Sequence, residues 1–369
     1  MFFAILLPAW VVMNLYIGWR AASVPLVARH VPRWLLAALV TLLAISYVLA
    51  RVVDAAGLTL LARPLELAGA TWLGVALLTF VTMLAVDVVT AFGFLFRSRA
   101  PSLRGWALVA AAILSSIALV QGLRAPVVRD YEVRLAGLPR ESDGAVLVFI
   151  SDLHLGSMLG QPWLAARIAQ VSALRPDAII VGGDVLEGDS PSERELVPAL
   201  ARLSAPLGVW AVAGNHEFYG GGAATLGLLE SQGFHVLRNT WTELRPGLVV
   251  AGVEPRDSRR ESAGGENRIA QALAGRPAGA ATILVSHAPS EVEQAAAAGV
   301  GLMLAAHTHD GQIWPFRYVI RLQFPFLAGR YEVGRMTLLV CRGTGTFGPR
   351  MRLWYPSEIL RITLRPLPG

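Results

Sequence analysis

The chain has 369 residues, of which 54% are hydrophobic and only 16% are charged, whereas soluble domains carry about 25% charged residues. This balance favours membrane-embedded sequence over a purely soluble protein. The whole net charge of +6 lies in residues 1–125, which hold nine arginines and three acidic residues, so the neutral remainder excludes a basic nucleic-acid-binding face.

Four apolar stretches lie in the first third of the chain. A helix needs about 20 apolar residues, with a range of about 17 to 25, to cross the hydrocarbon layer. The first stretch has no basic residue before it and no clear small-residue cleavage site after it, which favours a retained helix over a cleaved signal peptide. We therefore predict four transmembrane helices, at Met1 to Gly18, Trp34 to Ala50, Thr71 to Phe96 and Trp106 to Val120.

The placement of arginines near the ends of these spans predicts their orientation. The second loop is balanced by acids, whereas the first and third loops carry arginine alone: Arg20, Arg29, Arg33, Arg97, Arg99 and Arg104. These two loops are predicted to be cytoplasmic, with everything after the last span on the extracytoplasmic face. Four arginines follow the last span and bring the number of arginines on the two sides of the membrane to the same value. The prediction therefore depends on the first helix, which usually dominates the orientation.

Asp87 is the one charged residue inside a predicted span. Ionisable residues within a membrane are candidates for function. A transporter, however, would show several polar residues and helix breaks around a site at the midplane. These helices contain few such residues, which favours anchoring as their role.

Beyond residue 125 the pattern changes to short β-branched runs that alternate with helical segments, as in a layered α/β domain. We predict a linker over 124–144 and one domain over 145–369. The predicted strands are 145–150, 178–181, 208–213, 248–253, 282–285, 302–305, 337–340 and 359–364. The predicted helices are 162–174, 192–203 and 223–232.

Polar side chains directly follow five of these strands. Because the ends of strands in an α/β sheet converge on one crevice, we expect these side chains to meet. Five of the seven histidines are among them, and a group of this size outweighs the usual interpretation of a single histidine as a hydrogen-bonded core residue. The candidates are Asp152, His154, Asp184, Asn215, His216, His287, His307 and His309.

These groups predict a metal centre, because carboxylates and imidazoles buried together without a cation would repel one another and lose hydration. The single cysteine, Cys341, lies in an apolar run, so the ligands lack thiolate and suit Mn²⁺, Fe²⁺ or Fe³⁺, Zn²⁺ or Ni²⁺. Eight groups are too many for one tetrahedral ion. They suit two ions about 3.5–4 Å apart, an arrangement used in phosphoryl transfer.

The order of the motifs resembles the calcineurin-like metallophosphoesterase family, whose pattern is D-x-H, G-D, G-N-H-D/E, H and G-H-x-H. The chain matches it over about 145–365, except that Ala306 replaces a usual glycine. The resemblance implies a four-layer α/β/β/α sandwich, here preceded by the four helices. The segments His307 to Pro315 and Arg342 to Gly345 resemble the bacterial membrane-associated branch, which implies a multi-pass protein of the bacterial inner membrane.

The same resemblance implies a role for each candidate residue. Asp152, His154 and His309 would hold one divalent ion of Mn, Fe or Zn. Asn215, His287 and His307 would hold the second, with Asp184 bridging both. His216 would stabilise the transition state or act as general acid, while a metal-bridging hydroxide attacks phosphorus.

Several neighbouring residues carry weaker expectations. Glu217 would either orient His216 or interact with a helix dipole, and Asp310 and Gln312 are minor candidates for lining the crevice. His30 and His235 are not predicted to be ligands. The segment Trp314 to Tyr331 mixes aromatic residues with arginines, which suits either a membrane interface or loops that cover the core.

The predicted function is therefore that of a membrane-anchored two-metal phosphohydrolase. A phosphomonoester, a phosphodiester or a pyrophosphate fits as the substrate, and a phospholipid or lipid-linked phosphate is a candidate, with membrane lipids as partners. The alternative is a non-catalytic membrane receptor or scaffold that keeps a structural metal site. His216 favours the hydrolase, because this residue is not needed to hold a metal. The oligomeric state is not predicted.

Overall fold

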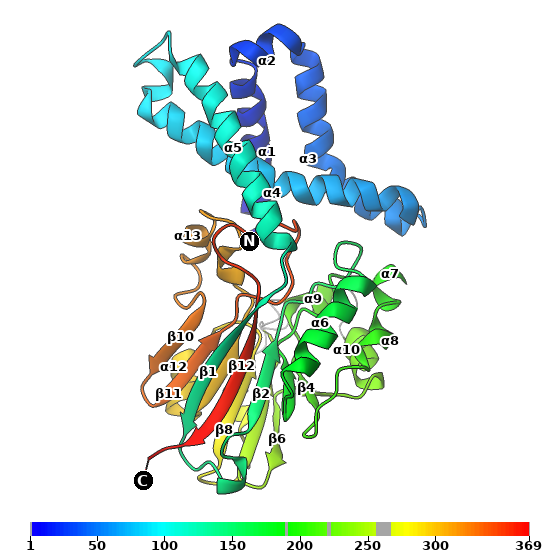
Figure 1. Cartoon of the computed structure of the whole chain (residues 1–369), viewed down its shortest axis with the longest axis vertical. Helices are drawn as coiled ribbons and strands as arrows, with labels where there is room; N and C mark the ends of the chain where they lie inside the picture. The colour runs from blue at the N-terminus through cyan, green and yellow to red at the C-terminus, as the bar shows by residue number, and fades with distance from the viewer. Residues whose placement is uncertain (1, 189–190, 220–222, 256–266, 369) are drawn as a thin grey trace. The chain divides into compact units, whose positions relative to one another are not determined.

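The computed structural model describes residues 2–188, 191–219, 223–255 and 267–368 (Figure 1). The chain forms two compact units. The first contains Met1–Arg124 together with Gly348–Trp354, and the second contains Ala125–Phe347 together with Tyr355–Gly369.

The first unit is helical. It consists of α1 (Phe2–Ala21), α2 (Pro25–His30), α3 (Arg33–Ala55), α4 (Thr59–Val89), the short η1 (Ala91–Gly93) and α5 (Ala100–Leu123). Among the described residues, three helices are long and apolar enough to cross a membrane, at Arg33–Asp54, Thr59–Val89 and Ala100–Leu123. They correspond to three of the four predicted spans. The remaining predicted span falls on α1 and stays a prediction, and Met1 lies outside the described residues.

The predicted bounds of the third span were wrong. Helix α4 begins at Thr59, twelve residues before the expected start, and includes Arg63, Pro64 and Glu66. Its N-terminal half is held by close packing against α3, because a side chain at Gly69 would overlap the backbone of Tyr47. The helix ends before Phe96, since Ala91 and Phe92 have φ angles of 48° and 58°.

Asp87 is fully buried in the last turn of α4. Its carboxylate lies 2.5 Å from Arg20 Nε and 2.7 Å from Arg104 Nη2, and the Tyr16 hydroxyl donates to it at 2.6 Å. These partners come from α1 and α5, so the charge is compensated by ion pairs that join three helices. Asp87 therefore has a structural role in holding α1, α4 and α5 together.

The second unit contains two six-stranded sheets (Figure 1). The first sheet runs in the order β1 (Val127–Leu135), β12 (Glu358–Pro366), β2 (Val146–Ile150), β3 (Ala178–Val181), β4 (Val209–Ala211) and β5 (Phe234–Val236). The second runs in the order β10 (Gly329–Val333), β11 (Met336–Val340), β9 (Leu302–Ala305), β8 (Ala281–Ser286), β7 (Leu248–Val253) and β6 (Thr240–Arg245). Strands β2 to β5 are parallel, and so are β7, β8, β9 and β11.

One hydrophobic cluster joins the two sheets, and it includes Phe149 and Ile180 of the first sheet with Ile283 and Leu304 of the second. The helices α6 (Gln161–Ala173), α8 (Val197–Leu200) and α10 (Ala223–Ser231) share a second cluster with the first sheet. The helices α11 (Arg268–Ala272) and α12 (Val292–Ala297) share a third with the second sheet. The mixed α/β fold with two sheets is therefore confirmed.

All eight predicted strands overlap observed strands, but β1, β5, β6 and β10 were not predicted. Strand β1 lies in the expected linker, where charged residues alternate with Val127, Tyr131 and Val133. It is an edge strand, and its four charged residues are exposed, which hides it from a search for apolar runs. The predicted helix 192–203 is divided into α7 (Pro191–Arg194) and α8.

Candidate metal centre

The eight candidate side chains all lie in segments that follow parallel strands. Asp152 and His154 follow β2, Asp184 follows β3, and Asn215 and His216 begin α9 (Asn215–Tyr219) after β4. His287 follows β8, and His307 and His309 follow β9, with His309 beginning η3 (His309–Gly311). Parallel strands of each sheet present their carboxyl ends at one edge, and the stacking of the two sheets brings both sets of loops together.

The ligand atoms fall into two neighbouring groups. In one, His309 Nε2 lies 3.4 Å from Asp152 Oδ1 and 3.2 Å from His154 Nε2. In the other, His287 Nε2 lies 3.2 Å from Asn215 Oδ1 and 3.1 Å from His307 Nδ1. Within each of the sets Asp152–His154–His309 and Asp184–His287–His307, the ligand atoms lie within 4.8 Å of one another.

Asp184 lies between the two groups. Its Oδ2 is 3.2 Å from His287 Nε2 and 3.9 Å from His154 Nε2. The other carboxylate oxygen, Oδ1, accepts the backbone N–H of His216 at 2.9 Å. This carboxylate is therefore placed where a single side chain can contact both sites.

The donor atoms fit a cation at each group. Nitrogen and oxygen ligands at about 2.0–2.2 Å from an ion are separated from each other by about 3.0–3.4 Å, and the separations here fall in that range. The buried Asp152 Oδ1 has no hydrogen-bond partner among the described residues. Carboxylate, imidazole and amide oxygen donors suit divalent ions of borderline or hard character.

The pKa values of the imidazoles are shifted in opposite directions, upwards at His154 and His287 and downwards at His307. Burial lowers the pKa of His154, but the Glu187 carboxylate outweighs burial and raises this pKa to about 9. Burial also lowers the pKa of His287, but the Asp184 carboxylate outweighs burial and raises this pKa to about 10. Burial and the neighbouring His287 charge lower the pKa of His307 to about 3. The pKa of Asp184 is lowered well below its usual value, because the attraction of charged His287 exceeds the effect of burial.

We expect metal binding at pH 7 to release about two protons per chain, one from His154 and one from His287, because metal ligands must be deprotonated. The measurement is the pH change of a weakly buffered solution of metal-free protein on addition of Zn²⁺. Affinity should rise with pH up to about 9–10, where both imidazoles lose their protons. Uptake of Zn²⁺ without proton release would contradict this charge state.

The same shifts predict the pH dependence of the metal-free protein. Both imidazoles have a higher pKa in the folded than in the unfolded state. Their contribution to stability is therefore complete below the unfolded pKa of about 6.5 and is lost as pH rises through about 9–10. Chemical unfolding of metal-free protein at several pH values measures this loss, and a metal-loaded sample is the control.

The backbone at the centre is strained. Asp152, His154, Asp184, His307 and His309 have φ angles of 51°, 44°, 51°, 69° and 50°. Side chains other than glycine rarely adopt this left-handed region, and such residues gather at functional sites. The surrounding fold thus forces five of the candidate ligands into positions that local preferences oppose.

Two glycines allow the ligand loops to approach closely. A side chain at Gly214 would overlap the Asp184 carboxylate, and one at Gly183 would meet the backbone of Gly214. Gly183 also has a φ of 94°, a conformation that only glycine adopts without cost. The glycine before Asp184 and the one before Asn215 are therefore required by space.

His216 lies beside the two groups. Its Nδ1 donates to the backbone carbonyl of Glu187 at 2.8 Å, which assigns the proton of the neutral ring to Nδ1 and leaves Nε2 as the nitrogen that exchanges a proton. Its ring lies 4.8 Å from the ring of His154. A ligand atom of His216 also lies within 4.8 Å of those of His154 and Asp184.

Two glutamates hold the loops of the centre. Glu187 was not predicted, although it lies three residues after Asp184; its carboxylate is 2.8 Å from His154 Nδ1. Glu217 accepts the backbone N–H groups of Asp184, Val185 and Gly214 at 3.0, 2.8 and 2.7 Å. Neither predicted role of Glu217 accounts for these bonds, since its carboxylate joins the two loops that carry Asp184 and Asn215.

The minor candidates of the following loop have structural partners. Asp310 is buried and pairs with Arg317 at 3.1 Å and Arg342 at 3.0 Å. The Gln312 amide bonds both to the backbone N–H and to the carbonyl of Phe347, each at 3.0 Å. Arg317 also donates to the Tyr355 hydroxyl at 2.7 Å, so this arginine of the segment Trp314 to Tyr331 is engaged within its own unit.

Two aromatic rings contact the imidazoles. The ring of Phe347 lies 5.3 Å from those of His154 and His216, and the ring of Phe324 lies 5.3 Å from that of His307. Phe347 is 49% exposed. The two histidines that were not predicted as ligands lie elsewhere: His235 stacks on Trp210, and His30 is exposed in α2.

Comparison with known proteins agrees with this geometry. Residues 145–311 match the family model described as calcineurin-like phosphoesterase. The chain is 31% identical to a "Transmembrane protein with metallophosphoesterase domain" of Danio rerio, over 70% of this chain and 62% of that one. It is 30% identical to the protein of that name in Bos taurus, over 78% and 68%. It is also 31% identical to an "Uncharacterized metallophosphoesterase" of Aquifex aeolicus, over 64% and 91%.

Proposed function

Since the chain belongs to the calcineurin-like metallophosphoesterase family, we propose that it is a membrane-anchored, metal-dependent phosphohydrolase. It would cleave a phosphomonoester, a phosphodiester or a pyrophosphate. The observation that carries this proposal is the placement of Asp184, whose carboxylate lies between two groups of ligand atoms. Two adjacent cation sites that share a carboxylate suit phosphoryl transfer to water.

The proposed ligands are those expected from the motifs. Asp152, His154 and His309 would hold one cation. Asn215, His287 and His307 would hold the other, and Asp184 would contact both. Two bound Mn, Fe or Zn ions would supply positive charge that polarises the phosphoryl oxygens and activates water.

The side chains around the ligands have separate roles in this proposal. His216 would hold or release a proton at Nε2 towards the phosphate or its leaving oxygen, because its Nδ1–H is fixed on the Glu187 carbonyl. Glu187 would orient His154, and a partner on the second ring nitrogen commonly fixes a metal-binding histidine in this way. Glu217 would keep the loops of Asp184 and Asn215 at a constant separation.

The test of this function is hydrolysis by the purified full chain supplied in turn with Mn²⁺, Fe²⁺ and Zn²⁺. Chromogenic phosphomonoesters, phosphodiesters and pyrophosphate are the substrates. Metal-dependent turnover of at least one of them is expected. If the metal-loaded protein hydrolyses neither these substrates nor a lipid phosphate, the alternative of a non-catalytic receptor or scaffold is favoured.

We propose a multi-pass arrangement in a bacterial inner membrane, with the catalytic unit on the extracytoplasmic face. Helices α3, α4 and α5 each have the length and composition of a span. The connection between α4 and α5 contains Arg97 and Arg99, which favours a cytoplasmic position for it. Because α5 then crosses back, the catalytic unit that follows it would be extracytoplasmic. The four-layer sandwich and a fourth span in α1 are part of the same proposal.

A lipid phosphate is the proposed substrate class. Two apolar side chains of segments that contact the centre are exposed: Phe347 is 49% and Val319 53% exposed. Val319 belongs to α13 (Arg317–Ile320), which packs against η3, the element that carries His309. An exposed apolar rim beside a phosphate site suits a substrate with an apolar tail.

We expect Phe347→Ala to lower kcat/KM for a lipid phosphate by about 10-fold, since removing a ring that contacts an apolar group costs about 1–3 kcal/mol. Hydrolysis of a small soluble phosphoester should change less than about 3-fold, because the Gln312 bonds to the Phe347 backbone are kept. Phe347→Leu is the control that retains apolar character. Equal losses on both substrates in Phe347→Ala would argue against a lipid.

A further inference from the structure

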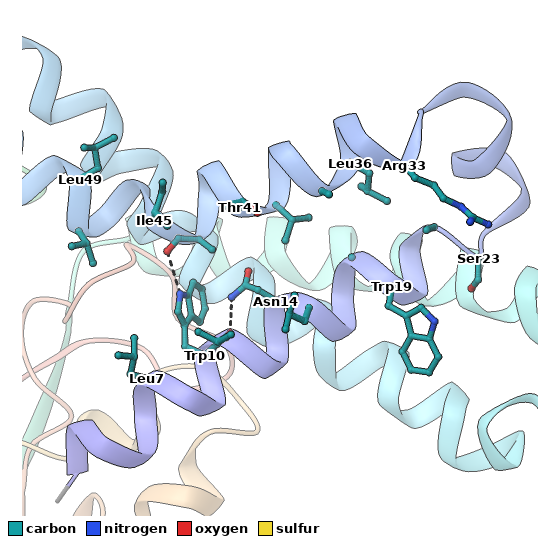
Figure 2. Close-up of a pocket in the computed structure, with 18 of the residues that line it drawn as sticks. Leu7, Trp10, Asn14, Trp19, Ser23, Arg33, Leu36, Thr41, Ile45 and Leu49 are labelled. Carbon is teal, nitrogen blue, oxygen red and sulfur yellow. Dashed lines mark hydrogen bonds between the residues drawn. The ribbon is translucent and has the colours of Figure 1, made fainter.

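The helical unit contains a groove that shares no residue with the metal centre. A groove between α1 and α3 encloses a cavity of about 940 Å³ (Figure 2). Figure 2 shows Leu7 and Leu49 at one end of the groove and Ser23 and Arg33 at the other. This volume is at the upper end of the range for small-molecule sites, about 300–1,000 Å³.

The middle of the groove is mainly apolar, because the polar groups of Trp10 and Asn14 bond within the protein. The Trp10 indole donates to the Ala44 carbonyl at 3.1 Å, and the Asn14 amide donates to the Trp10 carbonyl at 2.9 Å. The Asn14 carbonyl accepts the Trp72 indole N–H at 2.8 Å. Most of the remaining wall is aliphatic, including Leu15, Ile45 and Val48, which are 68%, 50% and 65% exposed. A ligand at this level has to be apolar.

The Arg33 end carries uncompensated positive charge. Among the residues that the structure describes, none pairs with the exposed Arg33 guanidinium. Residues 1–53 contain no aspartate or glutamate that could compensate it. At this end Ser23 Oγ accepts from Arg104 at 3.2 Å. A ligand that reaches this end is therefore expected to carry negative charge.

We propose that this groove binds an anionic phospholipid, with one acyl chain between α1 and α3 and the headgroup phosphate at Arg33. The apolar middle and the cationic end match the two parts of such a molecule. A second copy of the chain is a poorer occupant, because two copies inserted in the same orientation would bring their positive ends together. This site is separate from the proposed hydrolysis, and its test needs no turnover.

The experiment measures the lipid retained by the full chain after delipidation in detergent and exchange with dioleoyl-phosphatidylglycerol or dioleoyl-phosphatidylcholine. Native mass spectrometry counts the bound molecules. Wild type should retain phosphatidylglycerol at least about 5-fold better than phosphatidylcholine, since charge pairs at a membrane surface contribute about 1 kcal/mol. Arg33→Gln should abolish this preference, whereas Arg29→Gln, a charge in the same loop that does not line the groove, should keep it.

A groove-filling variant tests the acyl chain separately. A Cβ built at Gly18, which lines the groove, meets no heavy atom within 4 Å, so Gly18→Leu adds apolar atoms where the first side-chain carbon has space, and leucine favours helix. It should lower retention of both lipids several-fold. Ala38→Leu, on α3 but outside the groove, should retain them as wild type does. The proposal is overturned if wild type retains the two lipids equally or if Gly18→Leu retains them as wild type does. It is also overturned if the wild-type chain is a dimer that Gly18→Leu dissociates.

Discussion

Replacing His216 with alanine is expected to lower turnover of a chromogenic phosphodiester by about 10²–10⁴-fold, the usual contribution of a positioned acid or base. Metal content should stay at the wild-type level, because the proposed ligand sets are complete without this ring. The backbone N–H of His216 still donates to Asp184 in the variant, since the substitution leaves the main chain unchanged. The measurements are kcat and the metal content of the same purified sample.

His216→Asn is the matched variant, since its amide can donate to the Glu187 carbonyl in place of Nδ1 but cannot exchange a proton near neutral pH. It should fold and bind metal as well as wild type and lose activity as alanine does. Loss of a metal ion from His216→Ala would instead make this residue a ligand, as its closeness to His154 and Asp184 allows.

Asp184→Asn is expected to have the second large effect, on metal content as well as on activity. The carboxylate lies near ligand atoms of both groups, and a neutral amide cannot supply the negative charge that two cations share. We expect one metal ion or none per chain, and a loss of activity of more than about 100-fold. Metal analysis of the dialysed protein and the hydrolysis assay measure the two effects.

The variant also has a readout that is independent of turnover. The Asp184 carboxylate is the main group that raises the pKa of His287 to about 10. This pKa should therefore fall in Asp184→Asn. The metal-free variant should then release fewer protons than wild type when Zn²⁺ is added. Asp310→Asn is the control, because Asp310 is an equally buried carboxylate that pairs with arginines. It should keep both metal ions. Full metal content in Asp184→Asn would remove the shared-carboxylate proposal.

The sequence was informative about the second unit because buried parallel strands form continuous apolar runs. All eight predicted strands overlap observed ones, and β3 and β7 have the predicted bounds. The strands that were not predicted, such as β1 and β6, contain exposed polar residues. Their apolar side chains alternate with charges, and only pairing with a neighbouring strand identifies them.

The candidate ligands were also accessible from the sequence, because each motif places chemistry at the end of a strand and the topology brings those ends together. The supporting residues were not. Glu187 contacts His154 from the loop of Asp184, and Gln312 holds Phe347 from 35 residues away. Such partners depend on how loops pack, for which a single sequence contains no periodic signal.

The helical unit shows the same division. The sequence predicted four spans, and three of the described helices have the length and apolar character of a membrane span, because hydrocarbon demands long apolar segments. It could not identify the partners of Asp87, which come from α1 and α5, or the groove that α1 and α3 enclose. The sequence by itself thus determined which residues are apolar or chemically reactive and in what order, since those are properties of each side chain. The tertiary structure decided which of them meet, since residues distant along the chain come into contact only through packing.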